Sequence, residues 1–98
     1  MAAEGDDELR LADNPAERRY EAHLGERLAG YSEYVMAPGR LTFTHTVVDP
    51  DLEGRGIGSR LVRYELDDVR GRGLKVTARC PFVRAYIDRH PDYQDLVS

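Results

Sequence analysis

Alternating apolar and polar residues predict antiparallel strands in the first half of the chain. Leu9 and Leu11 alternate with polar neighbours, and Asn14-Pro15 ends this short strand. The same period of two runs through residues 19–24, where Tyr20, Ala22 and Leu24 share one face. Gly25-Glu26 then provides a hairpin turn. We therefore expect two short strands that pair with each other.

The next two predicted strands are longer and are separated by Pro38-Gly39. The first covers residues 28–37, and the second, the clearest in the chain, covers residues 41–48. Pro38 presets φ for a type II turn, and Gly39 accepts the positive φ that follows. In the second strand, one face is expected to carry Leu41, Phe43, His45 and Val47, and the other Thr42, Thr44, Thr46 and Val48. Both faces suit partial burial, which predicts a place in the middle of a sheet.

Helical periodicity begins after the glycines at positions 54–58. Residues 57–70 have a polar arc and a wide apolar face, and Glu65 and Asp68 lie within or beside that apolar face. A short strand over residues 74–78, a helix over 81–90 and a last strand over 93–97 follow. The order predicts an α/β fold: antiparallel N-terminal strands, then strand, helix, strand and helix, with one crossover.

Composition limits the class of protein. The 98 residues suit one domain, which we place at residues 9–98 behind a loose acidic tail at 1–8. Net charge is −4, with 14 Lys and Arg against 18 Asp and Glu, so nucleic acid is not an expected partner. Cys80 is the single cysteine, no CxxC pair or spanning apolar run occurs, and no metal site is expected. A cytoplasmic location is expected.

The turn Glu53-Gly54-Arg55-Gly56-Ile57-Gly58 connects a predicted central strand to a predicted helix. Glycines let the backbone approach a ligand, and a helix N-terminus favours a phosphate or pyrophosphate. The turn lacks the Gly-Lys-Ser/Thr of a P-loop and the spacing of a dinucleotide fingerprint. Two interpretations remain open on these residues alone: a phosphate site, or merely a tight connection.

The same residues resemble the GNAT-type N-acetyltransferases, whose signature is Gln/Arg-x-x-Gly-x-Gly/Ala at a helix start. Gly56 and Gly58 occupy the small positions, whereas Glu53 stands where Gln or Arg is usual. The segments His45-Thr46-Val47-Val48 and Cys80-Pro81-Phe82-Val83 are similar to the short, single-domain subgroup of that superfamily. The similarity extends from about residue 9 to the end of the chain, and it implies a minimal GNAT-like mixed sheet.

The resemblance implies acetyl-coenzyme A as acyl donor. Its pantetheine arm would run beside Thr46, Val47 and Val48 like an added strand. Its pyrophosphate would bind the amides of the helix start, at Arg55, Gly56, Ile57, Gly58 and Ser59. The thioester would then point towards Cys80.

Three residues are candidates for the chemistry. Tyr86 matches the Tyr that protonates coenzyme A in the family, or is simply a core residue. Cys80 stands before a helix, where a thiolate is favoured, so it either carries the acetyl group or is a small buried side chain. His45 is either a general base or, the interpretation we favour, a core histidine beside Leu41, Phe43 and Val47.

The leading function is an acetyl-coenzyme A-dependent N-acetyltransferase, either by direct transfer or through an acetyl-cysteine. The expected partners are the donor and an amine acceptor whose identity the sequence leaves open; the chain is expected to be a monomer or a weak homodimer. The alternative is a non-catalytic acyl-coenzyme A binding or sensing module, because so short a chain has little protein with which to build an acceptor pocket.

Overall fold

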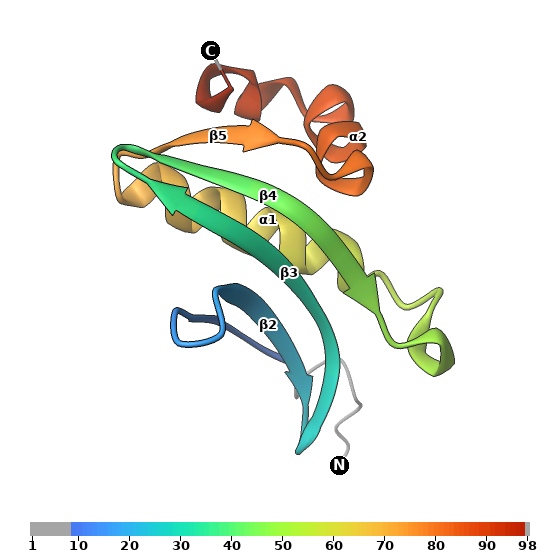
Figure 1. The fold of residues 1–98 in the computed structure, drawn as a ribbon. Coiled ribbons are helices and arrows are strands. Elements are labelled where there is room, and N and C mark those ends of the chain that lie inside the picture. Colours follow the sequence, from blue (N-terminus) through green and yellow to red (C-terminus); the bar gives the residue numbers. More distant parts are fainter. Residues whose placement is uncertain (1–8, 98) are drawn as a thin grey trace.

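The computed structural model describes residues 9–97, in which five strands form a single sheet ordered β1-β2-β3-β4-β5 (Figure 1). The strands are β1 (Leu9–Asn14), β2 (Arg19–Leu24), β3 (Arg27–Ala37), β4 (Arg40–Val48) and β5 (Lys75–Ala78). β1 to β4 pair antiparallel, and β5 pairs parallel to β4. The predicted α/β fold, with its antiparallel first half, is confirmed, and β4 lies between two strands as expected. Gly39 adopts a φ of 74°, as the predicted β3–β4 turn requires.

Two helices follow the antiparallel strands. A short 3₁₀ helix, η2 (Pro50–Leu52), leads into α1 (Ile57–Gly71), which crosses the sheet and returns the chain to β5. α2 (Pro81–Arg89) begins after β5, and Pro81 stands in its first turn, where no backbone N–H is needed. Both helices start where the sequence predicts.

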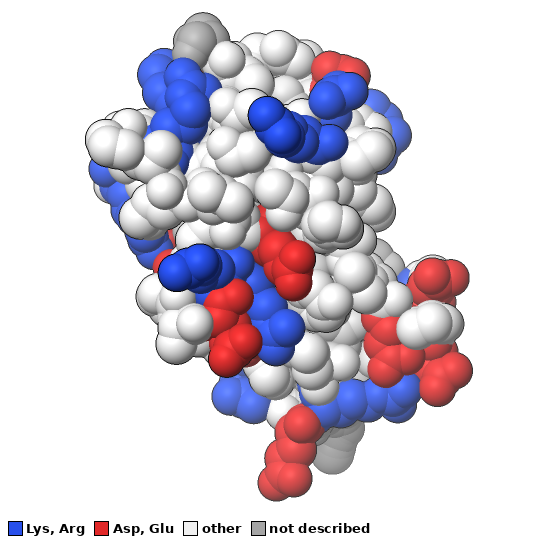
Figure 2. All heavy atoms as spheres, viewed as in Figure 1, with Lys and Arg blue, Asp and Glu red and all other residues white. Residues whose placement is uncertain are grey.

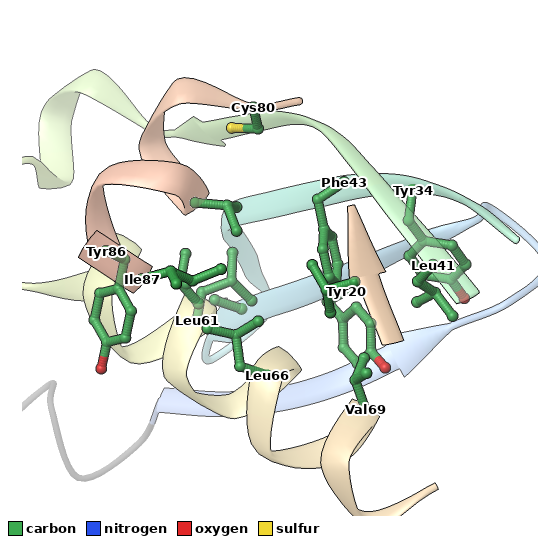
Figure 3. Close-up of a cluster of buried hydrophobic side chains, with 14 of the residues drawn as sticks. Tyr20, Tyr34, Leu41, Phe43, Leu61, Leu66, Val69, Cys80, Tyr86 and Ile87 are labelled. Carbon is green, nitrogen blue, oxygen red and sulfur yellow. The ribbon is translucent and has the colours of Figure 1, made fainter. Parts of the chain in front are cut away.

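The core lies between the sheet and the apolar face of α1 (Figure 3). Leu41 and Phe43 of β4 are fully buried, and so are Leu61 and Leu66 of α1. Burial of each such side chain contributes about 1.5–3 kcal/mol to folding. One charged residue, Glu65, is fully buried among them, on the apolar face where the sequence placed it.

Because β4 contains a β-bulge, the predicted assignment of its residues to two faces fails after Phe43. Glu33 pairs with His45 and Tyr34 with Phe43, so Thr44 is the extra residue in β4. An extra residue interrupts the strict alternation of side chains. Leu41 and Phe43 therefore point into the core, but His45 and Val47 are exposed on the opposite face. The expectations that these four residues share one face, and that His45 is a core histidine, are wrong.

The strand predicted over residues 93–97 is also wrong, because Pro91–Leu96 forms a 3₁₀ helix, η3. Pro91 presets a helical φ at its start. The Tyr93 N–H donates to the His90 carbonyl, and the Tyr93 hydroxyl donates to Asp67 of α1 at 2.6 Å. Leu96 is buried against the core. The hydrogen bonds within this turn and the contact of Tyr93 with α1 hold the segment in place, so it needs no partner strand.

Acidic and basic side chains are interspersed on the face drawn in Figure 2. Arg27 pairs with Asp49 and Asp51, and Arg70 pairs with Asp95. Such exposed pairs contribute little to stability individually. Among residues 9–97, no helix is long and apolar enough to cross a bilayer.

Candidate acyl-donor and acyl-transfer site

The first backbone amides of α1 are without helical acceptors. Gly56 is the N-cap, with a left-handed φ of 75°, and its carbonyl accepts from the Arg60 N–H at 3.0 Å. The amides of residues 57–59 precede that bond, so no helical carbonyl is available to them. Within the described chain, this first turn has no side-chain cap and no acidic residue. Within the first turn of α1 itself, no side chain therefore offsets the positive end of the helix dipole.

A cavity of about 250 Å³ lies at this helix start. Its walls come from the end of β4, the glycine turn, the start of α1 and the start of α2: Val48, Leu52, Glu53, Gly54, Gly56, Ile57, Gly58, Ser59 and Phe82. Of the predicted donor-binding residues, Arg55 is exposed and is not part of this wall. The others in the turn and helix start line it.

Gly58 allows three elements to meet at the cavity. A Cβ atom on Gly58 would lie 2.7 Å from Cζ of Phe82 and 3.3 Å from Cγ2 of Val48. At Gly58 the backbone of α1 therefore packs against the side chains of Phe82 and Val48, and an added side chain would require the exposed Phe82 ring to shift. The cavity, with the free amides of residues 57–59 along one side, fits the diphosphate of a coenzyme A-type ligand.

β4 and β5 separate just before the cavity (Figure 1). Their pairing stops at Phe43 and Ala78, whereas β4 continues to Val48. Within residues 9–97, this last part of β4 pairs with β3 alone. Asp49 N–H donates to Ala29 O at 2.8 Å, so by the antiparallel alternation the backbone groups of Thr46 and Val48 are directed to the open side. An extended ligand could add there as a strand would.

Cys80 lies where β5 ends and α2 begins, beside the open stretch of β4. Its N–H donates to Phe43 O at 3.0 Å, which anchors it to the point of separation. Its thiol donates to Oγ1 of Thr46 at 3.2 Å. The residue itself is nearly fully buried. Of the predicted site residues, the structure brings together Cys80 and Thr46.

The contacts of Thr46 extend into the core. Its Oγ1 lies 3.3 Å from Oγ of Ser32 on β3, and Ser32 Oγ donates to Oε2 of Glu65 at 3.1 Å. Burial raises the pKa of the Glu65 carboxyl well above its usual range, and Ser32 offsets only part of this effect. Four polar side chains from different elements thus form one hydrogen-bonded row: Cys80, Thr46, Ser32 and Glu65.

Sequence reasoning did not select Ser32 or Glu65 as site residues. Glu65 had a visible signal, because it is a carboxylate on the apolar face of a predicted helix. Such a residue either weakens the helix or has a buried polar partner. The sequence gives no comparable signal for Ser32, because a serine within a strand is common and does not indicate a functional site.

His45 is placed apart from Cys80. It neighbours Thr46 along β4, but its imidazole is 70% exposed on the opposite face, with Nδ1 3.8 Å from a carboxylate oxygen of Glu33. Val47 is exposed on that same face. A basic role for His45 is therefore compatible with a substrate on the open face of the sheet, and not with direct contact with the Cys80 thiol.

Tyr86 belongs to the buried stripe of α2. Its ring stacks on His90 with centroids 3.9 Å apart, and burial is the main cause that raises its pKa, with Arg63 and Asp67 of α1 as charged neighbours. Figure 3 shows its hydroxyl pointing away from Cys80. The structure therefore does not bring Tyr86 and Cys80 together, and the proton-donor role of Tyr86 stays a prediction. In residues 9–97 no cluster of His, Cys, Asp and Glu has the arrangement of a metal site.

Comparisons with known proteins agree with this geometry. Residues 19–96 match the model of a family described as GCN5-related N-acetyl-transferase. A GCN5-like N-acetyltransferase candidate from Staphylococcus aureus has a similar structure, with a TM-score of 0.72 and 22% identity over 93% of this chain and 89% of that one. No curated protein matches the chain significantly.

Two larger enzymes share the fold over part of their length. The ribosomal-protein-S18-alanine N-acetyltransferase of Escherichia coli aligns with a TM-score of 0.56 and 22% identity over 61% of this chain and 41% of its own. The ribosomal-protein-alanine N-acetyltransferase of Brucella melitensis biovar Abortus 2308 aligns at 0.54 and 21%, over 82% and 60%. At these identities the likeness concerns the fold. The family model, by contrast, matches most of this chain, which shows that the chain belongs to the GCN5-related N-acetyl-transferases.

Proposed function

We propose that this chain transfers an acetyl group from acetyl-coenzyme A to an amine, with Cys80 as an intermediate carrier. The observation that carries the proposal is the convergence of three features at one end of the sheet: free amides at the start of α1, an unpaired edge of β4, and a thiol between them. The first two features would bind a coenzyme A thioester, and the thiol would accept its acyl group.

The donor would occupy the site from the helix start to the thiol. The amides of residues 57–59, with the exposed side chains of Arg55 and Ser59 nearby, would hold the pyrophosphate. The pantetheine amides would pair with the backbone of Thr46 and Val48. This placement directs the thioester along β4 towards Cys80, which ends the neighbouring strand.

The transfer would proceed in two steps at Cys80. Its sulfur attacks the thioester carbonyl, a bond forms between Sγ and the acetyl carbon, and the bond to the coenzyme A sulfur breaks. The thiol proton leaves Sγ, and the coenzyme A thiolate takes up a proton. An amine then attacks the acetyl carbon, an amide forms, and Cys80 recovers its thiol with the proton that the amine loses.

The acceptor is an amine, and its identity is a separate question. Two fold relatives are named for acetylating an alanine of a ribosomal protein, but this chain spans only 41% and 60% of them. The acceptor would have to reach the acetyl group at Cys80, where β4 and β5 separate. His45 lies on the other face of β4, so this route gives it no contact with the attacking amine.

Donor binding is tested first, by thermal unfolding with coenzyme A and acetyl-coenzyme A. A ligand at about 100 times its Kd stabilises the native state by about 2.7 kcal/mol, which raises Tm by roughly 10 °C or more for a domain of this size. An unchanged Tm with both ligands contradicts the proposal.

Transfer is tested with acetyl-labelled donor and intact-protein mass spectrometry. We expect one acetyl group on the wild-type chain, none on Cys80→Ala, and loss of the label on adding amines. Cys80→Ser is the matched control, because it keeps a small polar side chain at the N-cap. Binding without label on the protein or on any amine supports the non-catalytic module instead.

A further inference from the structure

Glu65 is a buried carboxyl group without an adequate structural reason. It is fully buried on α1, and its Oε1 atom has no hydrogen-bond partner among the described residues. Leaving such an atom unpartnered in the core is destabilising, whereas an apolar residue would suit the core around it. Buried unsatisfied groups of this kind concentrate at functional sites.

The row of hydroxyl groups beside Glu65 ends at the thiol of Cys80. Cys80 donates to Thr46 at 3.2 Å, and Ser32 donates to Glu65 at 3.1 Å. The middle contact, 3.3 Å between Thr46 and Ser32, accepts either direction. When Thr46 is its donor, every hydrogen bond in the row points from the sulfur to the carboxylate.

From this alignment we propose that Glu65 exchanges a proton with Cys80 through Thr46 and Ser32, acting as the internal base for acyl transfer at the thiol and returning the proton afterwards. The inference rests on the proposed function. Glu65 does not touch the reacting atoms; it acts through the two hydroxyl groups and sets the protonation of the thiol.

One proton transfer from Cys80 to Glu65 involves three proton movements. The thiol proton moves to Oγ1 of Thr46, the Thr46 proton moves to Oγ of Ser32, and the Ser32 proton moves to Oε2 of Glu65. Both hydroxyl groups end as they began, the sulfur becomes the nucleophile, and Glu65 becomes a neutral acid. The reverse passage delivers that proton to the coenzyme A thiolate as it leaves.

The surroundings of Glu65 suit this exchange. Burial raises the pKa of Glu65, so its carboxylate is a stronger base than an exposed one. A negative charge on Cys80 raises it further. The two groups are therefore coupled, and the loss of one proton is shared between them.

Other ionisable side chains packed against α1 have their own partners. Tyr20 of β2 donates to Asp68 and Tyr34 of β3 to Asp13, while Tyr93 of η3 donates to Asp67. Tyr86 of α2 faces Arg63 and Asp67. On the elements around Glu65, Cys80 is the ionisable group whose charge acts on it.

The first test needs no donor. Because Cys80 is the sole cysteine, thiolate absorbance at 240 nm reports it alone below the pH at which tyrosines ionise, with Cys80→Ala as blank. In wild type we expect a broad or two-step titration, since a charged Glu65 opposes the thiolate. Glu65→Gln should titrate in one step, because the thiol no longer shares its proton with a second group. Superimposable curves would overturn the proposal.

The second test follows single-turnover acetylation of Cys80 against pH. Glu65→Gln and Ser32→Ala should both be slower by about 100-fold at pH 7, with a deficit that shrinks as solvent base removes the thiol proton at higher pH. Ser32→Ala interrupts the row but keeps both ionisable groups, so its thiol should still titrate in a way that depends on Glu65. A deficit that is equal at every pH indicates a structural role and refutes the relay.

Two controls separate the outcomes. Glu26→Gln makes the same chemical change at an exposed position outside the donor cavity and should leave the thiol titration unchanged. If wild-type protein forms no acetyl-cysteine, the proposed function fails, while the titration still decides whether Glu65 and Cys80 are coupled. Thermal unfolding of each variant confirms that it is folded at the temperature of the assay.

Discussion

Cys80 and Thr46 are 34 positions apart in the chain, yet the thiol of one donates to the hydroxyl of the other at 3.2 Å. Two features of the backbone produce this contact. The bulge at Thr44 places Thr46 on the same face as Phe43, and the bond from the Cys80 N–H to Phe43 O holds the start of α2 against β4. The contact thus joins the open edge of β4 to the only thiol of the chain.

Glu65 should make the stability of the protein fall as pH rises. Its folded pKa is raised, so between the unfolded pKa of about 4.5 and the folded pKa the native state holds a proton that the unfolded state has lost. The free energy of unfolding therefore falls as pH rises from 4.5 to the folded pKa of Glu65, by up to about 1.4 kcal/mol per pH unit. Urea unfolding at a series of pH values from 4.5 upward should show Glu65→Gln gaining on wild type as pH increases. A constant difference between the two proteins contradicts the raised pKa.

Glu21 should have the opposite effect in acid. Burial opposes its ionisation, but hydrogen bonds from His23, Arg19 and Asn14 prevail and lower its pKa to about 2. Its contribution is present above the unfolded pKa and is lost as pH falls through 2. Because ion pairs at the edge of the core are partly screened, we expect about 1–2 kcal/mol. The difference in unfolding free energy between wild type and Glu21→Gln, measured at pH 7 and pH 2.5, should shrink by that amount; parallel curves would disprove it.

A side chain at position 58 should impair donor binding. In Gly58→Val, the new atoms meet Phe82 and Val48, and Phe82, 40% exposed, must shift at the mouth of the cavity. We expect affinity for coenzyme A to fall by about tenfold or more, which is 1.4 kcal/mol. Gly71→Val is the matched control, because a Cβ there meets no atom within 4 Å. Equal affinities of the two variants, measured by calorimetry, would exclude this part of α1 from the donor site.

Tyr86→Phe tests whether the tyrosine of α2 donates a proton. Its hydroxyl points away from Cys80, so we expect acetyl transfer within about threefold of wild type, whereas loss of a general acid costs about 10²–10⁴. Single-turnover release of coenzyme A measures the step directly. A hundredfold loss without a change in donor affinity would instead establish Tyr86 as the proton donor in a rearranged complex.

Much of the fold follows from local patterns in the sequence. Period-two runs located β1 to β4, period-3.6 runs located α1 and α2, and Gly39 marked a turn that needs positive φ. These features depend on neighbours within a few residues, so they are readable before folding. The unsatisfied amides of α1 could be anticipated for the same reason, because a helix start always leaves them.

What only the tertiary structure decided is which side chains meet. The bulge at Thr44 depends on how β4 pairs with β3, and no local sequence pattern predicted it. This bulge exposes His45 and directs Thr46 towards Cys80. The row from Cys80 to Glu65 takes its members from β3, β4, α1 and the start of α2. Such contacts arise from long-range pairing and packing, and a sequence read in order contains their residue types but not their proximity.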